Sequence, residues 1–259
     1  MSNDMNLVQL LEWYITAGID VTCGVEPWEK CKTTAKAVET IANVSATRPA
    51  TTELAQATVS ACQNARQICA QAENLDELKK MVEDFNGCAL RLTANKTVFG
   101  YGFAQADLLL IGEAPGADED RSGIPFVGRS GHLLDKMLKA INVNREDCFV
   151  TNILPWRPPG NRTPTDAEVA VCLPFLKRQI ELVNPKVILV LGGSAANALL
   201  DNVDPISKLR GKWLEYKTSN DVKIPVLASF HPAYLLRNSG QKAKVWSDLL
   251  RVKQKLCEN

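Results

Sequence analysis

Three side chains that could do chemistry stand at or near the ends of apolar runs in this sequence: Glu113, Asn152 and His231. A carboxylate can offset positive charge or orient a water molecule, and an amide can match a donor and an acceptor on one ligand edge. A histidine can donate or accept a proton near neutral pH. If the fold brings these three residue types together, they would form a candidate functional site.

Each residue also has a plain structural interpretation. Glu113 could cap a turn, Asn152 could bond backbone at a strand end, and His231 could be a satisfied histidine before a proline. The loop Gly112–Gly116 could cradle a phosphate, but it matches neither of the common glycine-rich phosphate motifs. The shared position of the three residues therefore carries more weight than any one of them.

The elements that must position them alternate between strand and helix. Capping residues Thr165 and Glu168 open a helix that runs to Val183, and Pro174 inside it predicts a kink. Other helical patterns cover 131–141, 243–256 and a short stretch after Gly192-Gly193. The apolar runs that predict strands are Ala106–Ile111, Cys148–Leu154, Lys186–Leu191 and Ile224–Phe230.

This alternation predicts an α/β fold: three αβα layers around a central, mostly parallel four-stranded sheet. Parallel sheets that are covered on both faces bind ligands beyond the carboxyl ends of their strands. The loops that carry Glu113, Asn152 and His231 leave those ends, so we expect the three side chains to meet at one edge of the sheet.

Three segments differ in composition and in the pattern of their apolar residues. Residues 1–32 predict a short helical segment, with helical spacing over 5–18. Residues 33–74 are rich in Ala and Thr and predict a flexible linker, with weak helix near 52–72, because they offer little bulky apolar surface. Residues 75–259 have the composition and apolar patterning of a packed α/β domain. The prediction is therefore this domain with an N-terminal extension that is partly helical and partly flexible.

Composition sets broad limits. The 259 residues carry a formal net charge of +1, but residues 157–259 hold 16 basic and 9 acidic side chains, a weak indication of a polyanionic partner. The longest apolar runs, such as Val187–Leu191, are too short to span a bilayer, and no secretory signal is visible. Eight scattered cysteines suit buried thiols more than disulfides. We expect a cytoplasmic monomer, with no membrane association and no predictable protein partner.

Several motifs, in order along 75–256, resemble the uracil-DNA glycosylase superfamily, and its family 4 in particular. The resemblance rests on Gly112–Gly116 with Glu119-Asp120, Pro125–Gly128, Thr151–Ile153, Arg157–Arg162, Arg210–Lys212 and His231–Arg237.

The resemblance implies an enzyme of base excision repair. It would flip uracil out of DNA and hydrolyse the N-glycosidic bond, leaving an abasic site. Glu113 and His231 would be catalytic, and Asn152 would pair with the uracil edge. Glu119 would be a pocket wall, with a possible part in rejecting thymine. The uracil-binding residues implied are Ala114, Gly116, Glu119, Phe126 and Asn152.

The same resemblance implies a DNA-binding set on this edge. Leu235 matches the residue that fills the gap left by the flipped base. The basic members would bind phosphates, so binding should weaken with salt. They are Arg157, Arg162, Arg210, Lys212 and Arg237.

One departure concerns a cofactor. Family 4 enzymes resemble one another in holding a four-iron four-sulfur cluster on four cysteines, but only Cys88 and Cys172 stand at those positions here. Phe85 and Trp156 occupy the other two. Since such a cluster needs four ligands, we predict no cofactor and no metal, with the two aromatic rings filling the space.

Three alternatives stay open at this point. A relative could trap uracil-DNA covalently through a histidine, although the Pro158–Asn161 loop contains none. A non-catalytic module could bind DNA without releasing uracil. A metal-dependent nucleotide hydrolase could use the acids Glu113, Asp118, Glu119 and Asp120.

Overall fold

The computed structural model describes residues 50–258. The predicted helical segment over 1–32 lies outside the described residues. In chain order the helices and strands are α2 (Ala50–Gln71), α3 (Leu75–Asp84), α4 (Leu90–Thr93), β1 (Tyr101–Gly102), β2 (Leu108–Gly112), α5 (Ala117–Ser122), α6 (Arg129–Ala140), β3 (Cys148–Asn152), α7 (Asp166–Val183), β4 (Val187–Leu191), α8 (Gly193–Leu200), α9 (Ile206–Leu209), β5 (Trp213–Lys217), β6 (Lys223–Ser229), α10 (Pro232–Arg237) and α11 (Lys242–Cys257).

The sheet in the described part of the chain has six strands in the order β1-β3-β2-β4-β6-β5. The four central strands run parallel, as the apolar runs predict, and their Cα register pairs Gly112 with Asn152. The prediction of four strands is wrong at both edges, where β1 and β5 pair antiparallel with their neighbours. β1 has only two residues, and β5 is an edge strand with mostly exposed side chains, so neither forms a long apolar run.

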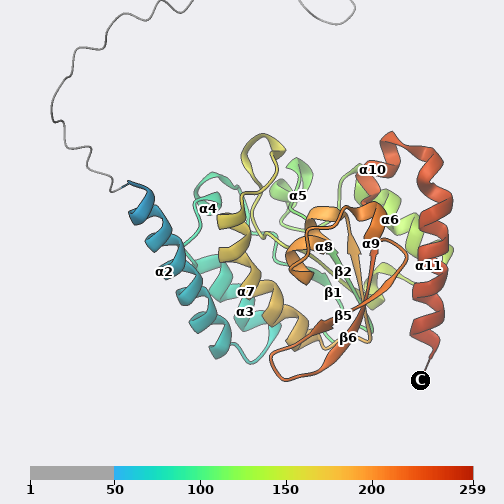
Figure 1. Ribbon diagram of the computed structural model, residues 1–259, viewed down its shortest axis with the longest axis horizontal. Coiled ribbons are helices and arrows are strands. Elements are labelled where there is room, and N and C mark those ends of the chain that lie inside the picture. The colour runs from blue at the N-terminus through green and yellow to red at the C-terminus, as the bar shows by residue number, and fades with distance from the viewer. Residues whose placement is uncertain (1–49, 259) are drawn as a thin grey trace, which may run out of the picture. The chain divides into compact units, whose positions relative to one another are not determined.

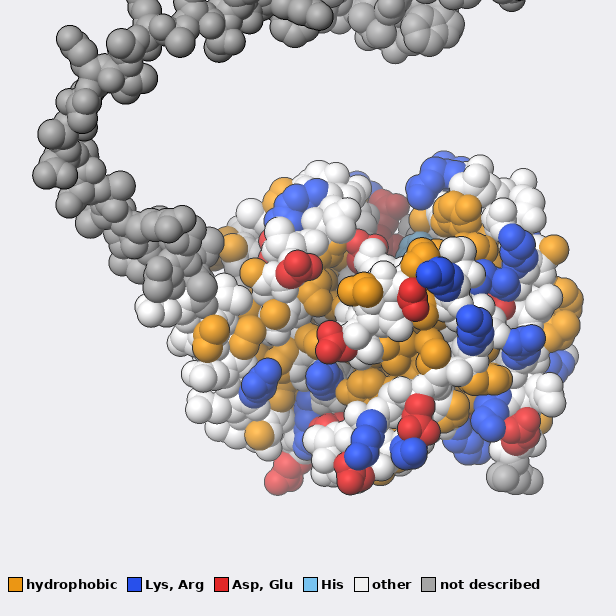
Figure 2. All heavy atoms as spheres, viewed as in Figure 1, with side chains coloured by type: hydrophobic (Ala, Val, Ile, Leu, Met, Phe, Trp, Pro, Cys, Tyr) orange, Lys and Arg blue, Asp and Glu red, His pale blue; other side chains and the backbone are white. Residues whose placement is uncertain are grey.

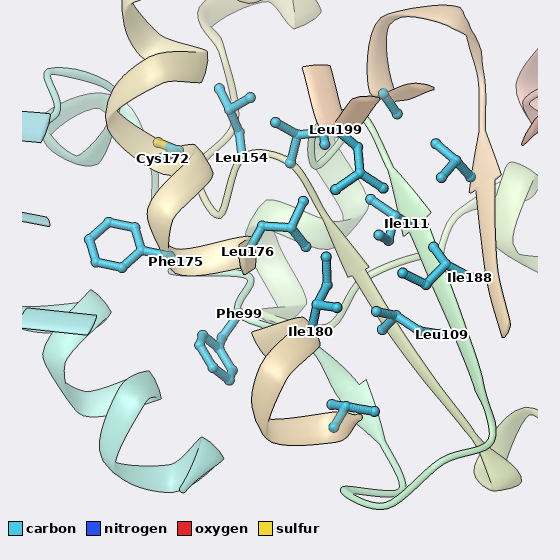
Figure 3. Close-up of a cluster of buried hydrophobic side chains, with 14 of the residues drawn as sticks. Phe99, Leu109, Ile111, Leu154, Cys172, Phe175, Leu176, Ile180, Ile188 and Leu199 are labelled. Atoms are coloured by element: carbon cyan, nitrogen blue, oxygen red, sulfur yellow. The ribbon is translucent and has the colours of Figure 1, made fainter. Parts of the chain in front are cut away.

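Helices cover both faces of this sheet, which gives the three layers (Figure 1). Side chains of α7 and α8 pack on one face, and side chains of α6, α10 and α11 pack on the other. Figure 3 shows the first layer, where Leu176 and Ile180 of α7 lie against Ile111 and Ile188 of the sheet. α7 runs through Pro174 as one helix.

The helix predicted near 52–72 is confirmed, but it packs into the core and is not part of a flexible linker as predicted for 33–74. Residues 50–71 form α2, a helix of 22 residues that lies along α7. Ala65 and Ala72 are fully buried in the core, and Cys69 is nearly so. The small side chains that suggested a lack of core material let α2 approach α7 closely, and α7 supplies the bulky apolar groups.

Candidate active site

A cavity of about 450 Å³ opens at the carboxyl ends of the parallel strands. Glu113 follows β2, Asn152 ends β3, and His231 follows β6 by two residues. The space-filling view shows a hollow at the top of the molecule, with acidic side chains and a histidine in its walls (Figure 2). The cavity is lined by Glu113, Ala114, Pro115, Gly116, Glu119, Phe126, Ser130, Asn152, Pro158, Asn161, Arg162, His231, Ala233, Tyr234 and Arg237.

Two lining side chains meet over Gly112. A Cβ atom on that glycine would lie 2.4 Å from Asn152 Oδ1 and 2.6 Å from Phe126 Cζ, so only glycine leaves room for both. Asn152 is 5% exposed, yet no other residue within 50–258 hydrogen-bonds to its side chain. A buried amide is normally paired, so the unpaired Asn152 amide is available to a ligand.

Phe126 forms an aromatic wall beside the histidine. Its backbone has φ +54°, in the left-handed region that an aromatic residue rarely adopts. Its ring stacks on the His231 ring with centroids 5.6 Å apart and 28° between the planes. Strained backbone of this kind persists where the surrounding structure fixes it, and it gathers at ligand sites.

His231 is held as a neutral imidazole. It caps the N-terminus of α10, where its Nδ1 accepts a hydrogen bond of 3.1 Å from the Ala233 N–H. Burial, aided by the Arg237 charge, lowers the pKa of His231 to about 4. An accepting Nδ1 assigns the ring proton to Nε2, so at neutral pH the side chain offers one N–H donor.

Glu119 lines the cavity, but its carboxylate is already engaged by backbone. Oε2 accepts from the Gly116 N–H at 3.1 Å, and Oε1 accepts from the N–H groups of Val127 and Gly128 at 3.0 and 2.9 Å. These bonds tie the loop after β2 to the loop that carries Phe126. The structure therefore gives Glu119 a bracing role in addition to its predicted place in the wall.

The acids after β2 do not gather around one point. Asp118 pairs with Arg121, while Asp120 is buried and accepts from the backbone and side chain of Asn95. Within residues 50–258 no group of three or more His, Cys, Asp and Glu side chains is arranged to hold a metal ion. The geometry thus gives no support to the metal-dependent hydrolase.

Four of the predicted phosphate-binding residues lie at the cavity or on the exposed surface. Arg162 and Arg237 line the cavity, and Lys212 is exposed. Arg162 also pairs with Glu168 at 2.6 Å, and that hydrogen bond lowers the pKa of Glu168 to about 2. Arg157 donates to Asn161 Oδ1 at 2.7 Å in the loop at the cavity mouth.

Two of the predicted DNA-binding side chains are mostly buried. Arg210 points inward to the buried Asp248, because that carboxylate needs a cationic partner, and its side chain is only 18% exposed. Leu235 is 1% exposed and packs in the core beneath α10, so it is not displayed to a duplex. The neighbouring Leu236 is 43% exposed.

Sequence reasoning also missed some lining residues. Tyr234 and Asn161 lie inside motifs that the sequence singled out, and their polarity was the available signal. Ser130, the second residue of α6, stands in no motif that would have drawn attention to it.

Phe85, Cys88, Trp156 and Cys172 are the four positions that the resemblance to family 4 assigns to a cluster, and they hold two aromatic residues and two cysteines. Phe85 and Trp156 stack with centroids 6.4 Å apart, and Phe175 meets Phe85 edge-on at 5.0 Å. The neighbouring Cys88 thiol and burial raise the pKa of Cys172. Two sulfurs beside two aromatic rings do not fit a cluster that requires four ligands.

The fold and the site together describe an α/β protein with a base-sized polar cavity at the strand ends. Residues 99–250 match the model of the uracil DNA glycosylase superfamily, and the chain belongs to that family. It is 39% identical to the type-4 uracil-DNA glycosylase of Archaeoglobus fulgidus over 189 residues, which cover 71% of this chain and 94% of the relative. It is 38% identical to that of Thermotoga maritima over 173 residues, or 66% and 88%.

A more distant similarity joins the chain to a type-5 uracil-DNA glycosylase of Pyrobaculum aerophilum. The two are 28% identical over 156 residues, which cover 54% of this chain and 67% of the relative. Among the described residues, no helix is both long enough and apolar enough to cross a bilayer.

Proposed function

We propose that this uracil-DNA glycosylase removes uracil from DNA for base excision repair, with Glu113, Asn152 and His231 around one flipped base. The family gives the hydrolase activity. The observation that supports the assignment of residues is their convergence on one cavity of about 450 Å³. The substrate partner of the site is uracil-containing DNA.

Asn152 selects the base. Its amide N–H donates to uracil O4 and its carbonyl oxygen accepts from N3–H, while Phe126 stacks on the ring. Cytosine presents the reverse donor and acceptor order, so it would leave buried polar groups unpaired. The unpartnered state of the buried Asn152 amide supports this role.

His231 stabilises the leaving base. Negative charge develops on uracil O2 as the glycosidic bond breaks, and the Nε2–H of the neutral ring donates to that oxygen. The hydrogen bond from the Ala233 N–H to Nδ1 fixes this tautomer before substrate arrives. The donor is therefore preorganised, which lowers the cost of reorganisation during the reaction.

Glu113 acts on the sugar side. Its carboxylate offsets the positive charge of the oxocarbenium-like sugar and orients the water that attacks the anomeric carbon. The water oxygen bonds to that carbon as the glycosidic bond breaks, and the bonding electrons leave with uracil. Ala114 and Gly116 line the cavity on either side of Pro115, so this backbone forms part of the uracil wall.

DNA binding uses the rim of the cavity. Arg157, Arg162, Arg237 and Lys212 bind phosphates, and Leu236 takes the wedge role because it is the exposed leucine of α10. An apolar side chain inserted between base steps fills the space that the flipped base leaves.

Aromatic packing replaces the iron–sulfur cluster in this chain. Trp156 is 1% exposed and its Nε1 donates to Thr97 Oγ1 at 3.0 Å, so its indole is fully accommodated. It precedes the loop Arg157–Arg162 and holds it against α7. We expect purified protein to contain substoichiometric iron and no absorbance band at about 400 nm. One cluster per chain would refute this.

The activity test compares uracil-containing oligonucleotides with matched thymine and cytosine strands, followed by alkaline cleavage at abasic sites. Only uracil strands should be cut, with or without EDTA. Glu113→Gln and His231→Ala should each reduce the rate by about 10²–10³-fold without loss of folding. Asp118→Asn is the matched control in the adjoining helix α5 and should leave the rate unchanged.

Each other outcome identifies a different function. A protein–DNA adduct that survives denaturing gels would indicate a covalent trap. Tight binding with no released uracil would indicate a binding module. Activity lost with EDTA, or lost in Asp118→Asn, would favour the metal-dependent hydrolase.

A further inference from the structure

A buried acid lies behind the segment that carries His231. Asp248 of α11 is 1% exposed, and its two carboxylate oxygens have different partners. Oδ2 accepts from the Ser229 hydroxyl at 2.7 Å, and Oδ1 accepts from Arg210 Nη2 at 2.7 Å. The same Nη2 donates to the Lys244 carbonyl at 2.6 Å. One guanidinium nitrogen therefore joins the residues after α9 to α11.

The glycine after Arg210 permits this contact. Gly211 has φ +69°, and a Cβ there would stand 3.0 Å from Asp248 Oδ1. Its N–H donates to the Ala228 carbonyl at 3.1 Å, which fixes the turn against β6. The Arg-Gly pair is thus explained by a close approach to the buried carboxylate, independently of any contact with DNA.

The network is adjacent to the cavity. Ser229 is the last residue of β6 and stands two residues before His231. The Arg210 guanidinium lies 5.5 Å from the centroid of the Phe230 ring, and that ring packs on Tyr234 with centroids 5.0 Å apart. Tyr234 lines the cavity. Both the strand end and the ring beside His231 are therefore anchored to Asp248.

We infer that Arg210, Asp248 and Ser229 are positioning residues that hold His231 in its productive orientation, and that Arg210 does not bind a DNA phosphate. This inference rests on the role of His231 in the proposed function. A buried carboxylate without its cation is strongly destabilised, so Arg210 is committed to Asp248. A small shift of β6 against α11 would move the Nε2–H away from uracil O2, where catalysis depends on geometry.

Two mild substitutions test the network. Arg210→Lys keeps a cation that could still contact phosphate but loses the guanidinium geometry, and Ser229→Ala removes one hydroxyl. Arg178→Lys is the matched control, because Arg178 donates to the Glu181 carboxylate and the Ala72 carbonyl on the α2 side of the molecule. The full chain is measured for single-turnover excision at saturating protein, for DNA affinity against salt, and for its imidazole NMR signals.

Arg210→Lys and Ser229→Ala should each slow the saturating rate by about tenfold, an effect of geometry on the reacting groups. The affinity and its salt slope should stay as in the wild type. The chain has two histidines, so the His231 signals can be assigned with a His132→Asn variant, and they should shift in both variants but not in Arg178→Lys.

A different result would overturn the inference. If Arg210→Lys keeps the saturating rate and the His231 signals, or if Arg210→Ala lowers the salt slope by about one while Ser229→Ala does nothing, Arg210 is a phosphate contact. If Arg210→Ala does not fold, Arg210→Lys and Ser229→Ala still decide the question. A wild-type protein that releases no uracil would instead contradict the proposed function.

Discussion

Asn152 is the last residue of β3, and Trp156 follows it by four residues. Both are buried, but only the polar group of Trp156 has a hydrogen-bond partner among the described residues. The indole N–H of Trp156 has a partner at 3.0 Å, and its ring stacks on Phe85, the residue that caps the end of α3. The Asn152 amide, 5% exposed, has no partner among the described residues. At these two positions the paired indole N–H belongs to the scaffold, and the unpaired amide lines the cavity, where a ligand can complete its bonding.

The largest expected effect tests the unpaired amide of Asn152. Asn152→Asp replaces the amide donor with a carboxylate, which only accepts at neutral pH and would face uracil O4. A site built to pair with a polar group rejects a mismatched partner by about 10⁴-fold, so kcat/KM for uracil strands should fall by that order. Excision assays measure it, and circular dichroism should show an unchanged fold. A loss below tenfold would remove Asn152 from base recognition.

The next effect tests the packed side chain of Trp156. Trp156→Ala should lower the free energy of unfolding by about 3–5 kcal/mol, because it leaves a large cavity beside Phe85. Urea denaturation measures this, and Trp213→Ala is the control, since Trp213 is 38% exposed on the edge strand. Equal losses in the two variants would show that the aromatic group does not brace the fold.

A smaller effect follows from the buried histidine. The folded-state pKa of His231, about 4, lies below its ordinary value of 6.5, so the unfolded chain binds this proton more tightly. Its contribution to stability is complete above pH 6.5 and is lost as the pH falls toward 4. Between pH 7 and pH 5 the wild type should lose about 2 kcal/mol that His231→Asn retains. Parallel curves for the two proteins would contradict the burial of a neutral imidazole.

The smallest expected change in activity separates two neighbouring leucines. Leu236→Ala should slow excision of base-paired uracil by about tenfold while a single-stranded substrate is less affected, since the wedge acts where a base is removed from a stack. Leu235→Ala should instead destabilise the fold by about 2–5 kcal/mol, because Leu235 is in the core. The reverse assignment would return the wedge role to Leu235.

The sequence predicts the central elements well because they carry strong local patterns. Four apolar runs became the four parallel strands, and the residues at their ends meet as expected. The edge strand β5 could not be predicted in this way, and α2 was predicted only as a weak helix within a flexible linker. β5 depends on its pairing with β6, and α2 depends on its contact with α7, 95 and more residues away in sequence.

The sequence pattern also could not predict the roles of residues that depend on which way a side chain points. Leu235 and Leu236 are equivalent in composition, and only the packing of α10 decides which one is exposed. Arg210 has the residue type of a phosphate ligand, but the buried acid that claims it lies 38 residues later in the chain. Long-range charge pairing of this kind has no local sequence signal.

The most direct measurement of the central claim is a crystal structure of the protein soaked with free uracil. We expect one uracil in the cavity, stacked on Phe126, with the Asn152 amide on O4 and N3–H and His231 Nε2 on O2. Glu113 should lie beside the N1 edge, where the sugar would attach. Uracil bound elsewhere, or bound in the cavity with Asn152 and His231 on no atom of the base, would contradict the account.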